Sequence, residues 1–296
     1  MNLARAGGIM VHSTWGDWFV ADEIEASSPD GLALWYLGCN GFVLRTPGTT
    51  VYIDPYFGDG DPPNTIRNIP VPMNPADATA CDAVLVTHEH VDHVHPPSYG
   101  PLVEDLGADI YAPEAAYESP QYDGEVDPPE DRKRVIDVGE EFEIGDLTIY
   151  VRGANDPDAI EPVSYVVEHE SGSFFHPGDS RPADAFDEVG REFDLDVGAF
   201  AFGTVGRIYK PADDVAEPTD WYNNGDQILD ATNRLGLDRL MPTHWDMWAG
   251  VGADPKAIVE HARSYPYPRQ VDLVSIGDRI DLDKPGIVPP QALRNE

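Results

Sequence analysis

Short strand-forming runs, arranged in two blocks with helical sequence after each, are the feature that most limits how this chain can fold. In the first block, Gly41–Arg45 and Thr50–Asp54 flank a turn at Pro47-Gly48, which predicts hairpins. Two such blocks predict an α/β fold built as a four-layer αββα sandwich. We expect strands at 32–37, 41–45, 50–54, 83–87, 109–111, 141–144, 147–152, 164–168, 173–176, 197–202 and 240–242, and helices at 98–106, 225–235 and 255–264.

Turn and cap residues refine these expectations. Asp254 before Pro255 predicts the N-cap of the last helix. The acidic, proline-rich stretch 118–131 predicts an exposed loop, and 271–282 predicts a hairpin-like segment. We expect a single domain over residues 1–296, with a core from about 32 to 265 and a strand-rich tail from 266 to 296.

Acidic residues outnumber basic ones by 54 to 19, for a formal net charge of −35 at pH 7. Such a surface repels phosphates, so we expect no nucleic-acid partner. The acids are spread along the chain, and we hypothesise a halophilic acidic surface, since at 1 M salt the Debye length falls to about 3 Å and self-repulsion is screened. No stretch reaches the roughly 20 apolar residues of a membrane helix, and residues 1–20 do not resemble a secretory signal. We therefore expect a cytoplasmic protein without a membrane partner.

Cysteine is scarce. Cys39 and Cys81 are too few for a disulfide framework or a cysteine metal site. We expect two small buried residues in or near strands rather than a disulfide bridge.

Four of the nine histidines lie within eight residues, and an apolar strand leads directly into them. They are His88, His90, His93 and His95, with Asp92 among them. Imidazole and carboxylate together suit zinc, manganese or iron. A solvated histidine-rich turn would not be expected to follow a buried strand in this way, so the pattern predicts a metal site.

The run Thr87-His88-Glu89-His90-Val91-Asp92-His93 resembles the H-x-H-x-D-H motif of the metallo-β-lactamase superfamily. Three more segments resemble superfamily motifs in the expected chain order. They are Val51–Pro55, which contains Asp54; His176–Ser180, which contains Asp179; and Pro242–Asp246, which contains His244. The resemblance covers residues from about 32 to 265.

This resemblance implies two divalent metal ions, Mn²⁺ or Zn²⁺. His88 and His90 would bind the first ion; Asp92, His93 and His244 would bind the second; Asp179 would bridge them, and Asp54 would support the metal loop. Two cations about 3.5–4 Å apart can share one hydroxide and lower its pKa toward about 7. Asp92 or a metal-bound water would then give a proton to the leaving group.

Within the superfamily, the chain is most similar to the L-ascorbate-6-phosphate lactonase group. The residues that carry this likeness are Trp35–Phe42, Ile53–Tyr56, Gly172–Ser180 and His244–Trp248 with Ala253-Asp254-Pro255. The group implies a hydrolase that acts on a lactone; it does not identify the substrate.

Two positions depart from the expected pattern. The loop Gly153–Asp158 lacks the histidine that many members place on the first metal, and Asp156 is our candidate replacement. Alternatively, a water or another acid binds the first metal at this place, or Asp156 only forms an Asx turn. A carboxylate ligand here would favour manganese. His95 stands where lactonase-like sequences usually have an acid, and we expect it to hydrogen-bond to a ligand rather than to bind metal.

For three residues near the motifs, the sequence allows more than one role. His176 contacts substrate, orients Asp179 or is purely structural, while Asp246 and Trp248 either shape the rim of the site or pack in the core.

Basic residues near the site are few. Arg181, Arg207 and Lys210 are candidates for binding the phosphate of a sugar-phosphate lactone. The alternative is ordinary ion pairs with the many surrounding carboxylates.

The leading hypothesis is a lactonase that acts on a small lactone, phosphorylated or not, through a metal-bridging hydroxide. A phosphodiesterase similar to N-acyl-phosphatidylethanolamine phospholipase D is the rival enzyme. A redox di-iron protein is disfavoured because that branch replaces the second histidine with glutamate, whereas this chain has His90. A non-catalytic metal-binding protein is the remaining alternative. We expect a small-molecule partner, and a homo-oligomer is left open.

Overall fold

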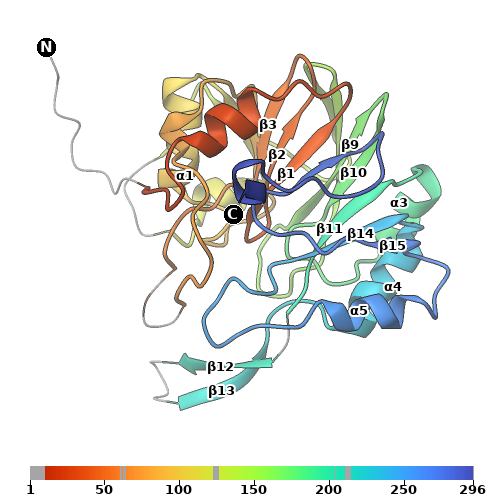
Figure 1. Cartoon of the computed structure of the whole chain (residues 1–296). Coiled ribbons are helices and arrows are strands. Elements are labelled where there is room, and N and C mark those ends of the chain that lie inside the picture. Colours follow the sequence, from red (N-terminus) through yellow and green to blue (C-terminus); the bar gives the residue numbers. More distant parts are fainter. Residues whose placement is uncertain are drawn as a thin grey trace, which may run out of the picture.

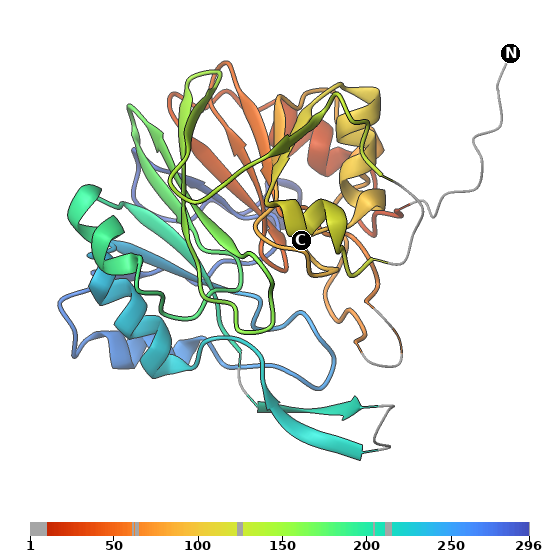
Figure 2. The same cartoon turned by 180° about the vertical axis from the view of Figure 1, so that it is seen from behind.

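In the computed structural model, two seven-stranded sheets lie face to face with helices on both outer faces (Figures 1 and 2). The structure describes residues 11–60, 62, 65–122, 127–203, 205–210 and 215–295, and for 205–210, 216, 217, 219, 294 and 295 it describes the backbone alone. The predicted αββα sandwich is therefore confirmed. Among the described residues, no helix combines the length and the apolar content that crossing a membrane would require.

The first sheet is built mainly from the N-terminal half, with one C-terminal strand at its edge. Its β1 strand is buried on both faces: Leu34 and Tyr36 contribute to the core between the sheets, while Trp35 packs under the outer helices. This explains why the strand is a continuous apolar run. In spatial order the strands are β16 (Arg279–Asp281), β1 (Ala33–Gly38), β2 (Gly41–Arg45), β3 (Thr50–Ile53), β4 (Ala83–Leu85), β5 (Asp109–Ala112) and β6 (Lys133–Val135).

The second sheet contributes the other wall of the inner core, with Val151, Tyr165 and Phe174 facing the first sheet. Its β10, β11 and β14 strands are parallel, and β7 to β10 form an antiparallel meander. In spatial order the strands are β15 (Gln270–Val271), β14 (Arg239–Thr243), β11 (Val197–Ala201), β10 (Gly172–His176), β9 (Val163–His169), β8 (Leu147–Gly153) and β7 (Glu141–Ile144).

Helical segments cover the two outer faces. The predicted helix at 225–235 is α4, which begins with a capping box formed by Asn224 and Gln227 and ends at Gly236 in the left-handed conformation. The segments over the first sheet are η1 (Phe19–Glu25), α1 (Pro96–Gly100), η3 (Pro101–Asp105) and α2 (Glu114–Glu118); those over the second are α3 (Phe186–Glu192), α4 (Gly225–Leu235) and α5 (Lys256–Ala262). Two short 3₁₀ turns are η2 (Pro75–Asp77) and η4 (Ala292–Asn295).

Three details of the sequence prediction are wrong. The helix expected at 98–106 begins at Pro96 and divides at Pro101, which has no backbone N–H to continue the helical hydrogen bonds. The N-cap of α5 is Pro255 and not Asp254, although the Asp254 carboxylate still accepts a bond from the Lys256 amide at 3.0 Å. Segment 271–282 is not a hairpin: β15 pairs with β14 in the second sheet, and β16 pairs with β1 in the first.

The exposed loop predicted at 118–131 can be compared with the structure only in part, since residues 123–126 lie outside the described part of the chain. Helices α2 and α3 and strand β6 were not predicted. Neither was the two-stranded sheet of β12 (Val205–Lys210) and β13 (Val215–Asp220), which extends from the body of the molecule in Figures 1 and 2.

Candidate metal centre

The residues predicted to bind metal or to support the metal loop follow strand ends of both sheets. Asp54 comes directly after β3, and the histidine loop follows β4, which is parallel to β3. Asp179 follows β10 and His244 follows β14, which both run parallel to β11. Because the carboxyl ends of parallel strands meet at one edge of a sheet, loops distant in sequence deliver their side chains to one place.

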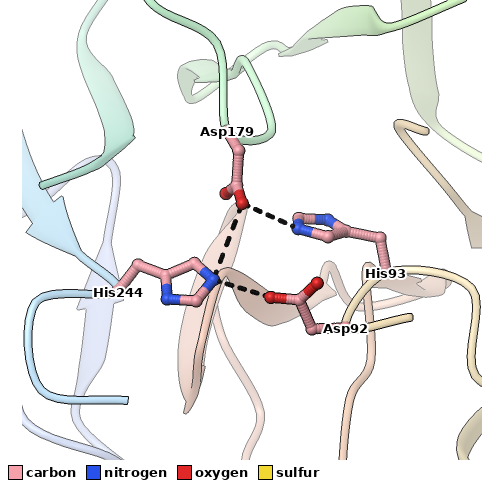
Figure 3. Close-up of side chains that lie close together, drawn as sticks. All are labelled: Asp92, His93, Asp179 and His244. Carbon is pink, nitrogen blue, oxygen red and sulfur yellow. Dashed lines mark hydrogen bonds and ion pairs between the residues drawn. The ribbon is translucent and has the colours of Figure 1, made fainter. Parts of the chain in front are cut away.

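Four buried side chains meet there from three loops. Asp92, His93, Asp179 and His244 point toward one another (Figure 3), with one nitrogen or oxygen atom of each within 4.8 Å of the others. His244 Nε2 lies 3.0 Å from Asp92 Oδ2 and 3.7 Å from Asp179 Oδ2. His93 Nε2 lies 3.3 Å from Asp179 Oδ2. We call these four residues the buried group.

Three further side chains form a second cluster, which is more open to solvent. His88 Nε2 lies 3.0 Å from His90 Nδ1, and Asp156 Oδ2 lies 3.4 Å from the first nitrogen and 3.5 Å from the second. Asp156 also accepts a bond from the Asp158 amide at 3.1 Å, so it forms the Asx turn and still faces both imidazoles. We call His88, His90 and Asp156 the outer group.

Asp54 holds the histidine loop in place. Its Oδ2 lies 2.7 Å from His93 Nδ1 and accepts the Thr87 hydroxyl at 2.7 Å, and its Oδ1 accepts the Thr87 amide at 2.9 Å. A carboxylate on the remote nitrogen of an imidazole fixes its tautomer and leaves the other nitrogen free to bind a metal. Asp54 therefore holds the imidazole of His93 and the backbone at Thr87 in place.

Asn40, to which the sequence analysis gave no role, holds Asp179. Its amide nitrogen donates to the Gly178 carbonyl at 2.7 Å and to Asp179 Oδ1 at 3.2 Å, and its amide oxygen accepts the Thr243 hydroxyl at 2.8 Å. Gly178 has φ +58°, and a Cβ there would lie 2.6 Å from Thr87 Oγ1. Only glycine fits this turn. The turn after β1 and the turn after β10 therefore set the place of Asp179 together.

Backbone strain is concentrated at the same place. Of the described residues other than glycine, only Cys39, Asp54 and His244 have positive φ, at 57°, 43° and 63°. Such conformations cost about 1–3 kcal/mol each and persist where the surrounding structure holds them, as at binding and catalytic sites.

The two groups differ in how they hold protons. Burial raises the pKa values of Asp92 and Asp179, but the imidazoles of His93 and His244 outweigh it and bring both below their usual range. Burial lowers the pKa of His93, yet Asp54, Asp179 and Asp92 outweigh it and raise that pKa well above its ordinary value. In the outer group, burial and then the charge of Asp179 raise the pKa of Asp156 to about 6.

These side chains fit divalent cations. His93 Nε2 is fully buried and faces Asp179 without the geometry of a hydrogen bond. Burial and the neighbouring His93 push the pKa of His88 well below its ordinary value, so its imidazole is neutral, as a metal ligand must be. Buried carboxylates also require compensating positive charge. Two ions, one in each group, would meet these needs.

Comparison with known proteins identifies the family. A family model described as "Beta-lactamase superfamily domain" matches residues 49–245, two thirds of the chain. This chain belongs to the metallo-β-lactamase superfamily. It is similar to a protein named "Probable L-ascorbate-6-phosphate lactonase UlaG" from Salmonella gallinarum, with 25% identity over 292 residues, which covers 82% of this chain and 78% of the relative.

Solved structures show the same fold. Igni18, described as a metallo hydrolase from Ignicoccus hospitalis, matches with a TM-score of 0.63 at 17% identity and covers 84% of this chain and 97% of its own. CmlA, a diiron β-hydroxylase from Streptomyces venezuelae, matches with a TM-score of 0.59 at 17% identity and covers 86% of this chain and 54% of its own. The family match and the lactonase relative identify this chain as a hydrolase of the superfamily. The likeness to Igni18 and CmlA shows the fold alone.

Two histidines that were considered as supporting residues, His95 and His176, lie outside both groups. His95 Nδ1 lies 2.6 Å from the Ser98 hydroxyl, so its hydrogen bond goes to helix α1 and not to a predicted ligand. Burial and the charge of Arg67 lower the pKa of His95 to about 4. His176 is fully buried, and its Nε2 donates to the Asn40 carbonyl at 2.8 Å. Of the alternatives for His176, its burial leaves no room for substrate contact.

A cavity of about 240 Å³ opens next to both groups of the superfamily site. Trp248 lines it, and its indole nitrogen donates to the Tyr222 hydroxyl at 2.9 Å. Asp246 lines a separate cavity of about 630 Å³, which Trp248 also lines. The residues of the first cavity are His90, Asp92, Gln121, Asp156, Asp158, Asp179, Trp221, Tyr222 and Trp248.

Of the three basic residues proposed to bind phosphate, only Arg181 has a described side chain, and it is not among these lining residues. Arg181 donates to the Asp220 carbonyl at 3.0 Å and so supports the backbone at the end of β13. Arg207 and Lys210 belong to β12, whose side chains lie outside the described part of the structure. Among the described residues that line the cavity, none is an arginine or a lysine.

Proposed function

We propose that this hydrolase is a lactonase that opens a small, uncharged lactone bound in the cavity beside the two groups. Its similarity to a probable lactonase supports the reaction class. The observation that carries the proposal is the cavity wall, which combines the predicted metal ligands with Trp221, Tyr222 and Trp248. Aromatic faces with a few placed polar groups are typical of sites for small organic ligands.

The two groups would hold two divalent cations, zinc or manganese. Cations bound there would lower the pKa of water and polarise a carbonyl oxygen. The chain's own part is to fix the ligands: Asp54 orients His93, and Asn40 orients Asp179. Imidazoles and carboxylates held in this way need little rearrangement when substrate binds.

Tyr222 is our candidate for the group that gives a proton to the leaving oxygen, in place of Asp92. Burial and the charges of Asp179 and Asp92 raise the pKa of Tyr222 well above its ordinary value, so it stays a phenol. Its oxygen accepts the bond from Trp248, which leaves the phenolic proton free to be donated into the cavity. Asp92 has a lowered pKa and is held as a carboxylate, which makes it a poor acid.

An uncharged substrate fits this cavity better than a phosphate ester. Asp92, Asp156, Asp158 and Asp179 all line the cavity. A phosphate dianion would meet these carboxylates with no basic partner among the described lining residues, and like charges repel. The same argument disfavours a phosphodiester substrate.

Parallel assays on the metal-loaded protein test the proposal. The substrates are an unsubstituted lactone, the same lactone carrying a phosphate ester, and a phosphodiester. We expect turnover of the uncharged lactone with the highest kcat/KM. Preference for the phosphorylated lactone would overturn the argument from charge, and turnover of the phosphodiester alone would overturn the lactonase proposal. Tyr222→Phe should lower kcat by about 10²–10⁴-fold if Tyr222 is the proton donor.

A further inference from the structure

Cys39 is held rigidly next to the buried group. It occupies the turn between β1 and β2, with φ 57°, directly after Gly38 at φ 89°. Its carbonyl accepts the His244 amide at 3.1 Å and the Tyr36 hydroxyl at 2.9 Å. The side chain is fully buried. The backbone therefore fixes the direction of the thiol, in a conformation that residues with a side chain rarely adopt.

The thiol faces two of the predicted ligands. Cys39 Sγ lies 3.2 Å from His244 Nε2 and 3.7 Å from Asp92 Oδ2. Two atoms bound to one zinc ion at about 2.1 and 2.3 Å, and about 90–120° apart, are separated by roughly 3–4 Å. The observed distances fall in that interval, as do those between His244 and the two carboxylates.

The thiol proton has acceptors on Asp92, since Cys39 Sγ lies 3.7 Å from Asp92 Oδ2 and 3.8 Å from the Asp92 carbonyl oxygen. His244 Nε2 faces Cys39 Sγ together with two carboxylate oxygens, Asp92 Oδ2 at 3.0 Å and Asp179 Oδ2 at 3.7 Å. Independently, His93 Nε2 is fully buried and turned toward the same space without a hydrogen-bond partner. A cation bound by Asp92 and His244 would lie within reach of the thiol as well.

We propose that Cys39 is a further ligand of the metal ion in the buried group, bound through Sγ. The thiol proton passes to solvent as the sulfur–metal bond forms. A thiolate makes this group softer than the outer group of His88, His90 and Asp156, so zinc or cobalt is preferred in the buried group, whereas manganese suits the outer one. The proposal rests on the metal-binding part of the proposed function and does not depend on which substrate is hydrolysed.

Cys81 provides a matched control within the chain. It precedes β4, at the opposite end of that strand from the histidine loop, is partly exposed, and its Sγ contacts the Ala83 carbonyl at 3.4 Å. Wild type, Cys39→Ser and Cys81→Ser differ only in which thiol is present.

Cobalt spectroscopy on the full chain tests the proposal. Metal-free protein is titrated with Co²⁺, and the near-ultraviolet thiolate-to-cobalt charge-transfer band is recorded with the visible d–d bands. We expect the charge-transfer band in wild type and Cys81→Ser and its loss in Cys39→Ser, with d–d bands in all three. Zinc affinity in Cys39→Ser should fall at least about tenfold, the lower end of the effect seen for groups that merely hydrogen-bond to ligands.

Several outcomes would overturn the proposal. These are visible cobalt bands in wild type without the charge-transfer band, survival of that band in Cys39→Ser, or no cobalt binding by wild type. If Cys39→Ser does not fold, X-ray absorption of zinc-loaded wild type replaces it: a sulfur neighbour at about 2.3 Å is expected, and a shell of nitrogen and oxygen alone contradicts the assignment. A charge-transfer band without lactone turnover would sink only the proposed function.

Discussion

The buried and outer groups contain the same kinds of side chain but are supported very differently. In the buried group, Asp54 fixes His93 and Asn40 fixes Asp179. In the outer group, His90 is half-buried, and Asp156 belongs to a loop whose next residues are exposed. The carboxylate pKa values follow the same division, since they are low for Asp92 and Asp179 and raised to about 6 for Asp156.

This difference suggests a division of labour. A rigid group with strongly anionic carboxylates would retain its metal ion, whereas a group whose carboxylate is easily protonated would bind and lose its ion more readily. Metal binding requires deprotonated ligands, so proton and metal compete directly at Asp156. The experiments below can break or sharpen this contrast.

The largest effect is expected for Asp179→Ala, because Asp179 borders both groups. Loss of several kcal/mol of transition-state stabilisation should lower kcat/KM by at least about 10³-fold, measured as initial rates on the lactone with metal in excess. Asp184→Ala is the control, since Asp184 is fully exposed on the surface. Unchanged hydrolysis in the Asp179 variant would contradict the mechanism for both groups.

A selective effect on the buried group is expected for Asp54→Asn. The variant loses the carboxylate that fixes His93, so metal affinity at the buried group should fall about 10–100-fold. Titration calorimetry should show the tighter binding event weakened and the weaker one nearly unchanged. Equal weakening of both events would mean that Asp54 supports the loop as a whole and does not distinguish the groups.

The outer group should respond to pH through Asp156. Its pKa is raised to about 6, so the carboxylate is ionised at pH 7 and protonated at pH 5, and metal binding at this group should weaken as the pH falls through 6. Asp156→Asn mimics the protonated form. We expect the wild type to bind metal in the outer group more tightly than the variant at pH 7, and the difference to shrink about tenfold between pH 7 and pH 5, since one pH unit below the pKa about a tenth of the carboxylate stays ionised. A difference as large at pH 5 as at pH 7 would exclude Asp156 as the titrating ligand.

The smallest effect on the site is expected from salt. Salt screens exposed charges far more than buried ones, so adding potassium chloride should raise the unfolding temperature of this chain of net charge −35. Metal affinity of the buried group should change little over the same range. A stability that does not depend on salt down to millimolar concentrations would defeat the hypothesis of a halophilic surface.

Much of the fold could be predicted because the informative patterns are local. Gly41–Arg45 and Gly225–Leu235 have the predicted bounds. The tail could not be predicted, since β15 and β16 pair with strands of different sheets, and no local pattern encodes partners so distant. The short helix α3 has no side-chain cap that would mark its start.

In the candidate site, too, the residues in local motifs could be predicted, and those whose contacts are distant in sequence could not. The histidine loop, Asp179 and His244 stand in recognisable motifs, and the structure brings them together. Asn40 and Tyr222 could not be found in this way, because their roles depend on residues far along the chain, such as Asp179, 139 positions from Asn40. The signals for Asn40 were the glycine-flanked turn Gly38–Gly41 and its place in Trp35–Phe42, a segment that resembles the lactonase group. Arg181 illustrates the reverse: proximity to Asp179 in sequence did not place its guanidinium at the cavity.

The central claim is that the two groups are two metal sites sharing Asp179. Anomalous diffraction from crystals of the metal-loaded protein tests it most directly. The account predicts two anomalous peaks about 3.5–4 Å apart, one among Asp92, His93 and His244 and one between His88, His90 and Asp156, with the Asp179 carboxylate between them. A metal bound elsewhere, or Asp179 beyond bonding distance of any peak, would contradict it.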